Sequence, residues 1–139
     1  MTMNLTLNIR TAVRSLLFAT AIACLAGCHR APEATRPTIS SAELAQQIQN
    51  GTAPLILDVR TPDEYRAGHI PGSVNIPIDE LQSRLSELKI SKSAEVVVHC
   101  EHGGRAAKGE TILAGAGYDH VVDLDGHMAG WRDSKLPVE

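Results

Sequence analysis

The sequence is poor in aromatic side chains, with one Trp, two Tyr and one Phe among 139 residues, and it has no excess of positive charge. Four rings are too few for a surface on which successive nucleic-acid bases stack. Thirteen Lys and Arg against sixteen Asp and Glu give a net charge of −3, which disfavours binding along a phosphate backbone. Long apolar runs are missing beyond the N-terminus, which excludes a polytopic membrane protein. We expect no nucleic-acid partner.

The N-terminal segment is typical of a bacterial export signal. Residues 1–14 carry two basic and no acidic side chains, and residues 15–26 form an apolar run that is short for a bilayer span. The run ends in Leu-Ala-Gly-Cys at residues 25–28, which resembles the lipobox of bacterial lipoproteins. That resemblance implies a lipoprotein signal peptide over residues 1–27 and acylation of Cys28. A plain signal peptide or a buried apolar helix is the alternative.

Lipidation at Cys28 would anchor the chain in the cell envelope, facing the periplasm. His29, which follows Cys28, is not the acidic retention signal of some bacterial lipoproteins, so the outer membrane is favoured over the inner. Residues 28–37 contain two prolines and little apolar character, which indicates an extended tether. The folded domain is then expected over residues 38–136.

Processing at Cys28 would leave Cys100 as the one free thiol. Removal of residues 1–27 takes Cys24, Arg10 and Arg14, so the mature 112 residues carry eleven basic and sixteen acidic side chains. A single thiol cannot form a disulfide within the chain, although the implied compartment is oxidising. A small apolar residue would pack as well without the redox liability. We therefore expect Cys100 to have a functional role.

Apolar strands alternate with amphipathic helices along the rest of the chain. Strands are predicted at residues 55–57, around 74, at 95–99 and at 121–122. Helices are predicted from Ser40 or Ser41 to residue 50, at 62–65, 79–88 and 105–116, and as a turn at 126–133. This alternation predicts an α/β fold with a parallel sheet.

The segment from His99 to Ala106 carries the clearest chemical signal. A β-branched strand delivers Cys100 to a loop with two glycines, Gly103 and Gly104, and a helix begins near Arg105. Ligands of doubly wound sheets bind at the carboxyl ends of strands, and a helix N-terminus favours an anion. These features favour a nucleophilic thiolate at Cys100. A buried structural cysteine is the alternative.

Four motifs resemble those of rhodanese-type sulfurtransferases. The loop matches the pattern Cys-x-x-Gly-x-Arg, and residues 57–65 resemble the DVR...EY motif. Residues 68–77 resemble the GHIPGAINIP motif, and residues 117–131 the GY..V..L.GG...W ending. The resemblance covers about residues 38–136. It implies a doubly wound, five-stranded parallel sheet with helices on both faces.

The resemblance also implies the reaction and the partners. Cys100 would take sulfane sulfur from thiosulfate or a persulfide donor and pass it to a thiophilic acceptor, cyanide or a thiol. Asp58 and Arg60 would belong to a polar network that supports the loop. The simpler interpretation is a structural ion pair with Glu64. No cofactor and no metal are implied. The loop N–H groups that would bind the transferred sulfur belong to Glu101, His102, Gly103, Gly104 and Arg105.

Two positions depart from the family pattern, and three further histidines need a role. Glu101 places a carboxylate where an anionic donor prefers a neutral or basic neighbour. His127 replaces the second glycine of the ending motif, at the expected cost of a local backbone adjustment; His127 and His120 are both expected to be exposed. His102 is either a proton shuttle or a solvated loop residue, and His69 is expected to fix its turn by hydrogen bonding.

Other function classes share parts of this pattern. A phosphatase or arsenate reductase of the same fold is one, because the sequence His-Cys…Arg resembles their phosphate loops. Those loops hold one residue more between Cys and Arg than the four found here, and the shorter ring favours a sulfur atom. A lipid-anchored, non-catalytic binding module is another class. A soft-metal site at His99, Cys100 and His102 is disfavoured because adjacent strand residues point to opposite faces.

The substitution Cys28→Ala tests the lipoprotein hypothesis. We expect it to abolish acylation and to leave the chain uncleaved or in the soluble fraction, because the acyl chains supply the membrane attachment. Cell fractionation and intact mass are the measurements. Cys24→Ala, within the same signal segment, should be processed like the wild type. Unchanged processing and membrane association in Cys28→Ala would contradict the hypothesis.

Overall fold

The computed structural model describes residues 36–139, and the predicted signal, Cys28 and most of the predicted tether lie outside these residues. One five-stranded sheet has the order β1-β5-β4-β2-β3, and all neighbouring strands are parallel. The α/β fold with a five-stranded parallel sheet is therefore confirmed. The strands are β1 (Thr38–Ile39), β2 (Leu55–Asp58), β3 (Val74–Asn75), β4 (Glu95–His99) and β5 (His120–Leu124).

Strand β1 is the element that the sequence pattern does not predict. Two residues are too few to show the alternation that identifies a strand. It is held at the sheet edge by its neighbour, since the N–H groups of Asp123 and Asp125 donate to the carbonyls of Pro37 and Ile39, each at 2.9 Å. The partner strand is more than eighty residues away in the chain, so no local signal marks this pairing.

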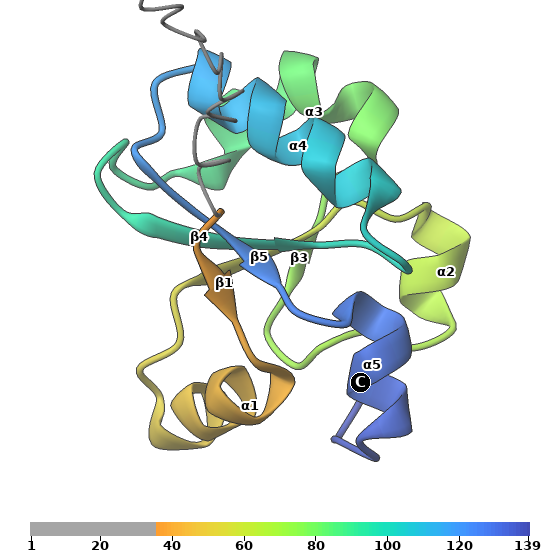
Figure 1. Cartoon of the computed structure of the whole chain (residues 1–139). Helices are drawn as coiled ribbons and strands as arrows, with labels where there is room; N and C mark the ends of the chain where they lie inside the picture. Colours follow the sequence, from red (N-terminus) through yellow and green to blue (C-terminus); the bar gives the residue numbers. More distant parts are fainter. Residues whose placement is uncertain (1–35) are drawn as a thin grey trace, which may run out of the picture. The chain divides into compact units, whose positions relative to one another are not determined.

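Helices cover both faces of the sheet. Figure 1 shows α3 and α4 on one side of the strands, and α1 and α5 on the other. Alternate residues of β4 follow this division, with Val96 and Val98 packed in the core under α3 and α4, and Val97 in the core under α1 and α5. The helices are α1 (Ser41–Asn50), α2 (Pro62–Arg66), α3 (Ile78–Arg84), α4 (Gly104–Gly115) and α5 (His127–Asp133), with a 3₁₀ turn η1 (Leu85–Leu88).

Helix ends agree with the local chemistry of the sequence. The Ser40 hydroxyl accepts the Glu43 N–H at the start of α1, and Thr61 and Glu64 form a capping box at the start of α2. The predicted helix at 79–88 is α3 continued by η1, so its last turn tightens to 3₁₀ geometry. Among residues 36–139, no helix is long and apolar enough to cross a membrane.

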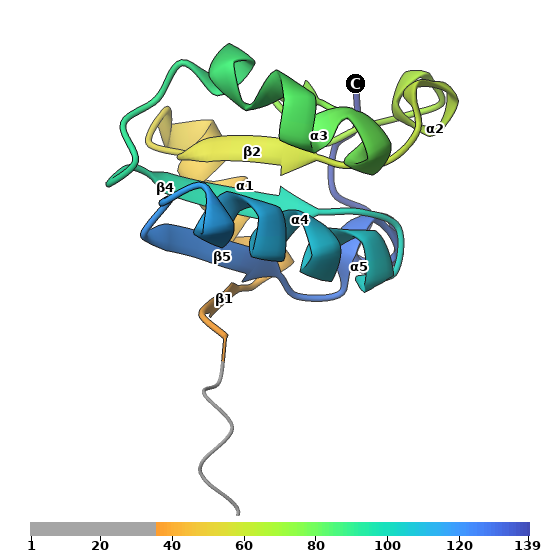
Figure 2. The same ribbon diagram turned by 90° about the horizontal axis from the view of Figure 1, so that it is seen from above.

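The carboxyl ends of the central strands meet at one edge of the sheet. Figure 2 shows β2, β4 and β5 pointing the same way, toward the side on which α2 and α5 lie. Register pairs Asp58, the last residue of β2, with His99, the last residue of β4. The loop that follows His99 therefore begins beside the end of β2, where an α/β sheet places its ligands.

Candidate active site

Cys100 directly follows β4, and its side chain is 1% exposed. The N–H of Gly103 donates to the Cys100 sulfur at 3.0 Å. Gly103 has a φ of 99°, which favours glycine, and it caps α4, which begins at Gly104. The loop therefore turns back over the sulfur and leads directly into a helix N-terminus, whose dipole favours negative charge on the sulfur.

Arg105 is held by Glu64 rather than left free beside the thiol. Its two terminal nitrogens donate to the two carboxylate oxygens of Glu64, both at 2.6 Å. This bidentate bond lowers the pKa of Glu64 to about 2 and raises the pKa of Arg105, with a smaller contribution to Arg105 from the neighbouring Cys100. The capping box of α2 holds the same carboxylate, so α2 orients the loop arginine.

Asp58 and Arg60 form a buried ion pair beneath the loop. They are 0% and 1% exposed, and Arg60 donates to Asp58 from its main-chain N–H, Nε and Nη2 at 2.7–3.1 Å. Arg60 also donates to the Gly68 carbonyl at 2.9 Å. The expected ion pair with Glu64 is wrong, because Glu64 is turned toward Arg105. Arg60 instead reaches the loop after Cys100 through Glu101, at 3.5 Å.

The Glu101 carboxylate is paired on both sides. One oxygen lies 3.5 Å from Arg60, and the other accepts a hydrogen bond from Arg132 of α5. Two guanidinium groups therefore offset the charge of this carboxylate, and its effect on an anionic donor stays a prediction. Arg132 has no signal in the sequence, because it is 31 residues from Glu101 and follows the last motif.

His99 is fully buried next to Cys100, and neither ring nitrogen has a hydrogen-bond partner. Burial lowers the pKa of His99 to about 4, although the Asp58 carboxylate, 3.7 Å away, opposes this effect. His99 is therefore neutral at pH 7 and cannot serve as a cation for the loop. His102, in contrast, is exposed at the loop surface, and so is Gly104.

His127 is not exposed, which corrects the expectation for this residue. It is 9% exposed at the first position of α5, with a φ of 50°. A Cβ added to Gly103 would lie 2.6 Å from its Nε2, so the imidazole packs against the loop. His120 is exposed as expected. His69 fixes its turn through Nδ1, which lies 3.1 Å from the Tyr65 carbonyl.

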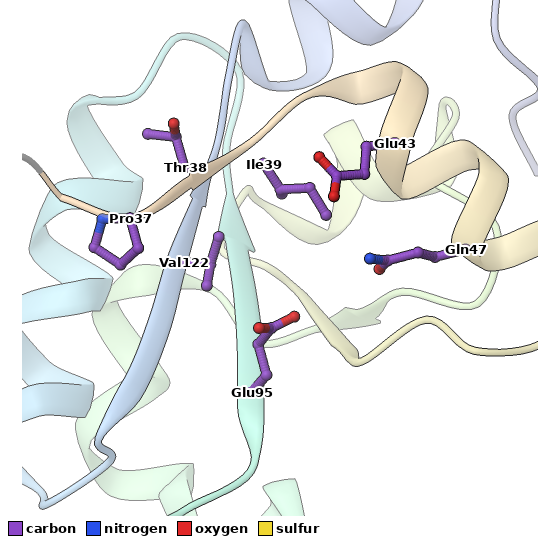
Figure 3. A pocket seen from close by; sticks show the side chains of 7 residues that line it. All are labelled: Pro37, Thr38, Ile39, Glu43, Gln47, Glu95 and Val122. Carbon is purple, nitrogen blue, oxygen red and sulfur yellow. The ribbon is translucent and has the colours of Figure 1, made fainter.

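A cavity of about 210 Å³ is lined by residues of α1 and of the strands β1, β4 and β5 (Figure 3). It is lined by Glu43 and Gln47 of α1 and by Glu95, the first residue of β4, with apolar walls from β1 and β5. Cys100 follows the last residue of β4, so the length of the strand separates the two places. This cavity is not part of the candidate active site.

Comparison with known proteins places this geometry in a family. The rhodanese-like domain family matches residues 40–134. A sulfurtransferase of Allochromatium vinosum is 33% identical over 100 residues, which cover 72% of this chain and 92% of that protein. Thiosulfate sulfurtransferase PspE of Escherichia coli is 34% identical over 58% of this chain and 74% of its own length. The crystal structure of a rhodanese-related protein from Thermoplasma volcanium is 33% identical with a TM-score of 0.64, covering 74% of this chain and 97% of that one.

The neutral, buried His99 should make the protein sensitive to acid. Its pKa is about 4 in the folded chain and near 6.5 in the unfolded chain, so unfolded molecules bind a proton first as the pH falls. The stabilisation is complete above pH 6.5 and is lost as the pH falls toward 4. We expect about 1–3 kcal/mol of unfolding free energy to be lost over this interval.

His99→Leu should remove that part of the pH dependence, because it removes the titrating imidazole. No hydrogen bond of the ring is lost with it, so the fold should be kept. Urea unfolding at pH 7.5, 6.0 and 4.5 measures the effect. His120→Asn, which changes an exposed histidine, should keep the wild-type slope. An identical slope in His99→Leu would show that His99 titrates normally.

Proposed function

The chain belongs to the rhodanese-like domain family, and from this premise we propose that it is a sulfurtransferase that carries sulfane sulfur as a persulfide on Cys100. The observation that carries the proposal is the Gly103 N–H aimed at the Cys100 sulfur at 3.0 Å, at the start of α4. A main-chain donor and a helix N-terminus stabilise an anion on sulfur whether it is a thiolate or a persulfide.

The reaction has two balanced halves. The Cys100 thiolate attacks the outer sulfur of thiosulfate, a new S–S bond forms, the S–S bond of thiosulfate breaks, and sulfite leaves with the electron pair. An acceptor such as cyanide or a thiolate then attacks the terminal sulfur of the persulfide and takes it away. The electron pair of the broken bond returns to Cys100, so no external oxidant or reductant is needed.

The arginine of the loop supports sulfur transfer over phosphate chemistry. A phosphatase loop uses its arginine to bind phosphate through paired N–H groups. Both terminal nitrogens of Arg105 are engaged with Glu64 at 2.6 Å. The four residues between Cys100 and Arg105 also make a small ring, which suits a single sulfur atom better than a tetrahedral oxyanion.

Three arginine–carboxylate pairs surround the loop, and their formal charges cancel. They are Arg105–Glu64, Arg60–Asp58 and Arg132–Glu101. An anionic donor such as thiosulfate therefore meets a locally balanced site. Thiosulfate and organic persulfides are both compatible with it, and we propose that the Glu101–Arg132 pair sets the preference between them.

The N-terminal segment supports a proposal for the place of action. We propose that acylated Cys28 anchors the enzyme in the cell envelope, with the sulfurtransferase domain facing the periplasm and the outer membrane favoured. The support is the basic, then apolar, segment that ends in Leu-Ala-Gly-Cys. Its test is the Cys28→Ala experiment described above.

The substitution Cys100→Ser tests the chemistry directly. Wild-type protein treated with thiosulfate or a persulfide should gain the mass of one sulfur atom, and cyanide should remove it. Cys100→Ser should fold normally and lose all transfer, because a hydroxyl cannot hold sulfane sulfur. Intact mass before and after each reagent is the measurement. A wild type that takes up no sulfur from any donor but hydrolyses aryl phosphates would refute the proposal.

The substitutions Arg132→Gln and Glu101→Gln test the balance of charge at the loop. Removing Arg132 uncovers the Glu101 carboxylate and should raise the KM for thiosulfate about three- to tenfold, whereas Glu101→Gln should lower it. Neither should change the KM for an uncharged sulfane-sulfur donor by more than about twofold.

Lys92→Gln is the matched control for Arg132→Gln, because it also removes one positive charge. Lys92 precedes β4, whereas Cys100 follows the last residue of that strand. We expect wild-type KM values for both donors in this variant. Equal shifts in Arg132→Gln and Lys92→Gln would mean that overall charge, rather than the Glu101 pair, governs donor affinity.

A further inference from the structure

His127 stands where the family motif has a glycine, and its backbone keeps the conformation that glycine prefers. Its φ is 50° at the first residue of α5. A positive φ is uncommon for a residue with a side chain and persists only where the surroundings determine it. The side chain is 9% exposed, so packing holds it in place.

The imidazole fills the space that Gly103 leaves open. A Cβ on Gly103 would lie 2.6 Å from Nε2 of His127, which is shorter than real Cβ contacts, and 3.2 Å from Cδ2, which is tighter than most of them. The N–H of the same glycine donates to the Cys100 sulfur. The His127 ring therefore packs against Gly103, the residue whose N–H donates to the Cys100 sulfur.

The other side of the ring faces an acidic group. Nδ1 of His127 is buried and lies 3.7 Å from Oδ1 of Asp123 on β5. Neither of these two atoms has a hydrogen-bond partner. Burial and the Asp123 carboxylate raise the pKa of Glu110 on α4, although Arg36, which lies 3.4 Å from Glu110, opposes this effect.

The first turn of α5 also binds the loop through its backbone. The N–H of Met128 donates to the Cys100 carbonyl at 3.0 Å, and the N–H of Ala129 to the Glu101 carbonyl at 3.3 Å. Together with the His127 ring, these bonds give the loop three contacts with three successive residues. The position of α5 and the position of the loop are thus fixed together.

We propose that His127 is a positioning residue for sulfur transfer, whose imidazole holds the Gly103 N–H against the Cys100 sulfur while Asp123 orients the ring. The inference rests on the proposed function and adds a residue to the machinery of that site. Small displacements of a positioned group lower the rate of a chemical step by one to two orders of magnitude. Binding of the donor outside the loop is affected less.

Three substitutions separate positioning from mere packing. His127→Gly keeps the backbone conformation and removes the ring, and His127→Asn keeps a polar group toward Asp123 but is too short for Gly103. Both should lower kcat for transfer from thiosulfate to cyanide about tenfold or more, with KM changed less than about threefold. His127→Gln, which reaches Gly103, should restore most of kcat. His120→Asn, at an exposed histidine, is the control and should match the wild type.

The measurements are made on the full chain, with kcat normalised to the fraction of molecules that load sulfur by intact mass. Unchanged kcat per loaded molecule in His127→Gly and His127→Asn would overturn the inference. Equal losses in all three variants, without rescue by glutamine, would also overturn it. Absence of transfer in the wild type would instead be a failure of the proposed function, and it is seen before any variant is compared.

A double substitution tests the contact independently of transfer. Gly103→Ala in the wild type should lower the melting temperature strongly, because its Cβ meets the imidazole at 2.6 Å and its φ is 99°. In the His127→Gly background, the same change should cost much less, since only the backbone strain remains. Equal shifts in the two backgrounds would show that the ring and Gly103 do not touch, and would overturn the inference.

Discussion

The buried ion pair of Asp58 and Arg60 is the interaction on which the rest of the site depends. Both side chains are withdrawn from water, which is unfavourable unless nearly every donor and acceptor is bonded. Arg60 meets this demand by bonding Asp58, the Gly68 carbonyl and, at 3.5 Å, Glu101. Arg60 thereby connects the end of β2 with the turn at Gly68 and with the loop after Cys100. Loss of one partner would leave a buried charge, at a cost of about 3–5 kcal/mol.

This balance of charge determines what is left to stabilise a sulfur anion. Each arginine near the loop is already matched by a carboxylate, so a thiolate at Cys100 gains little from net positive charge. The stabilisation then comes mainly from directed dipoles, namely the Gly103 N–H and the N-terminus of α4, with a smaller contribution from the neighbouring Arg105. Such groups act at short range and depend on geometry. The backbone of the loop therefore matters more than the number of charges around it.

Features with a local cause could be predicted from the sequence, and features with a distant cause could not. Neighbouring residues determine three features that the structure contains: the Ser40 cap, the strand before Cys100 and the glycine turn. The family motifs extended this to the five-stranded sheet. The partners of Arg105 and Glu101 cannot be predicted in this way, because Glu64 and Arg132 lie 41 and 31 residues away. A charge is visible in a sequence, but the group that neutralises it is not.

The burial of Cys100 links the geometry of the loop to the compartment that we propose for the enzyme. A thiol that is 1% exposed is shielded from bulk oxidants, and oxidation of cysteine follows exposure as well as thiolate character. In the sulfur transfer that we propose, shielding also restricts the first half-reaction to donors that can bring their sulfur to a recessed atom. A persulfide extends the reactive sulfur about 2 Å beyond the cysteine, so the second half-reaction is less restricted. In the proposed reaction, the same loop can therefore be selective toward donors and permissive toward acceptors.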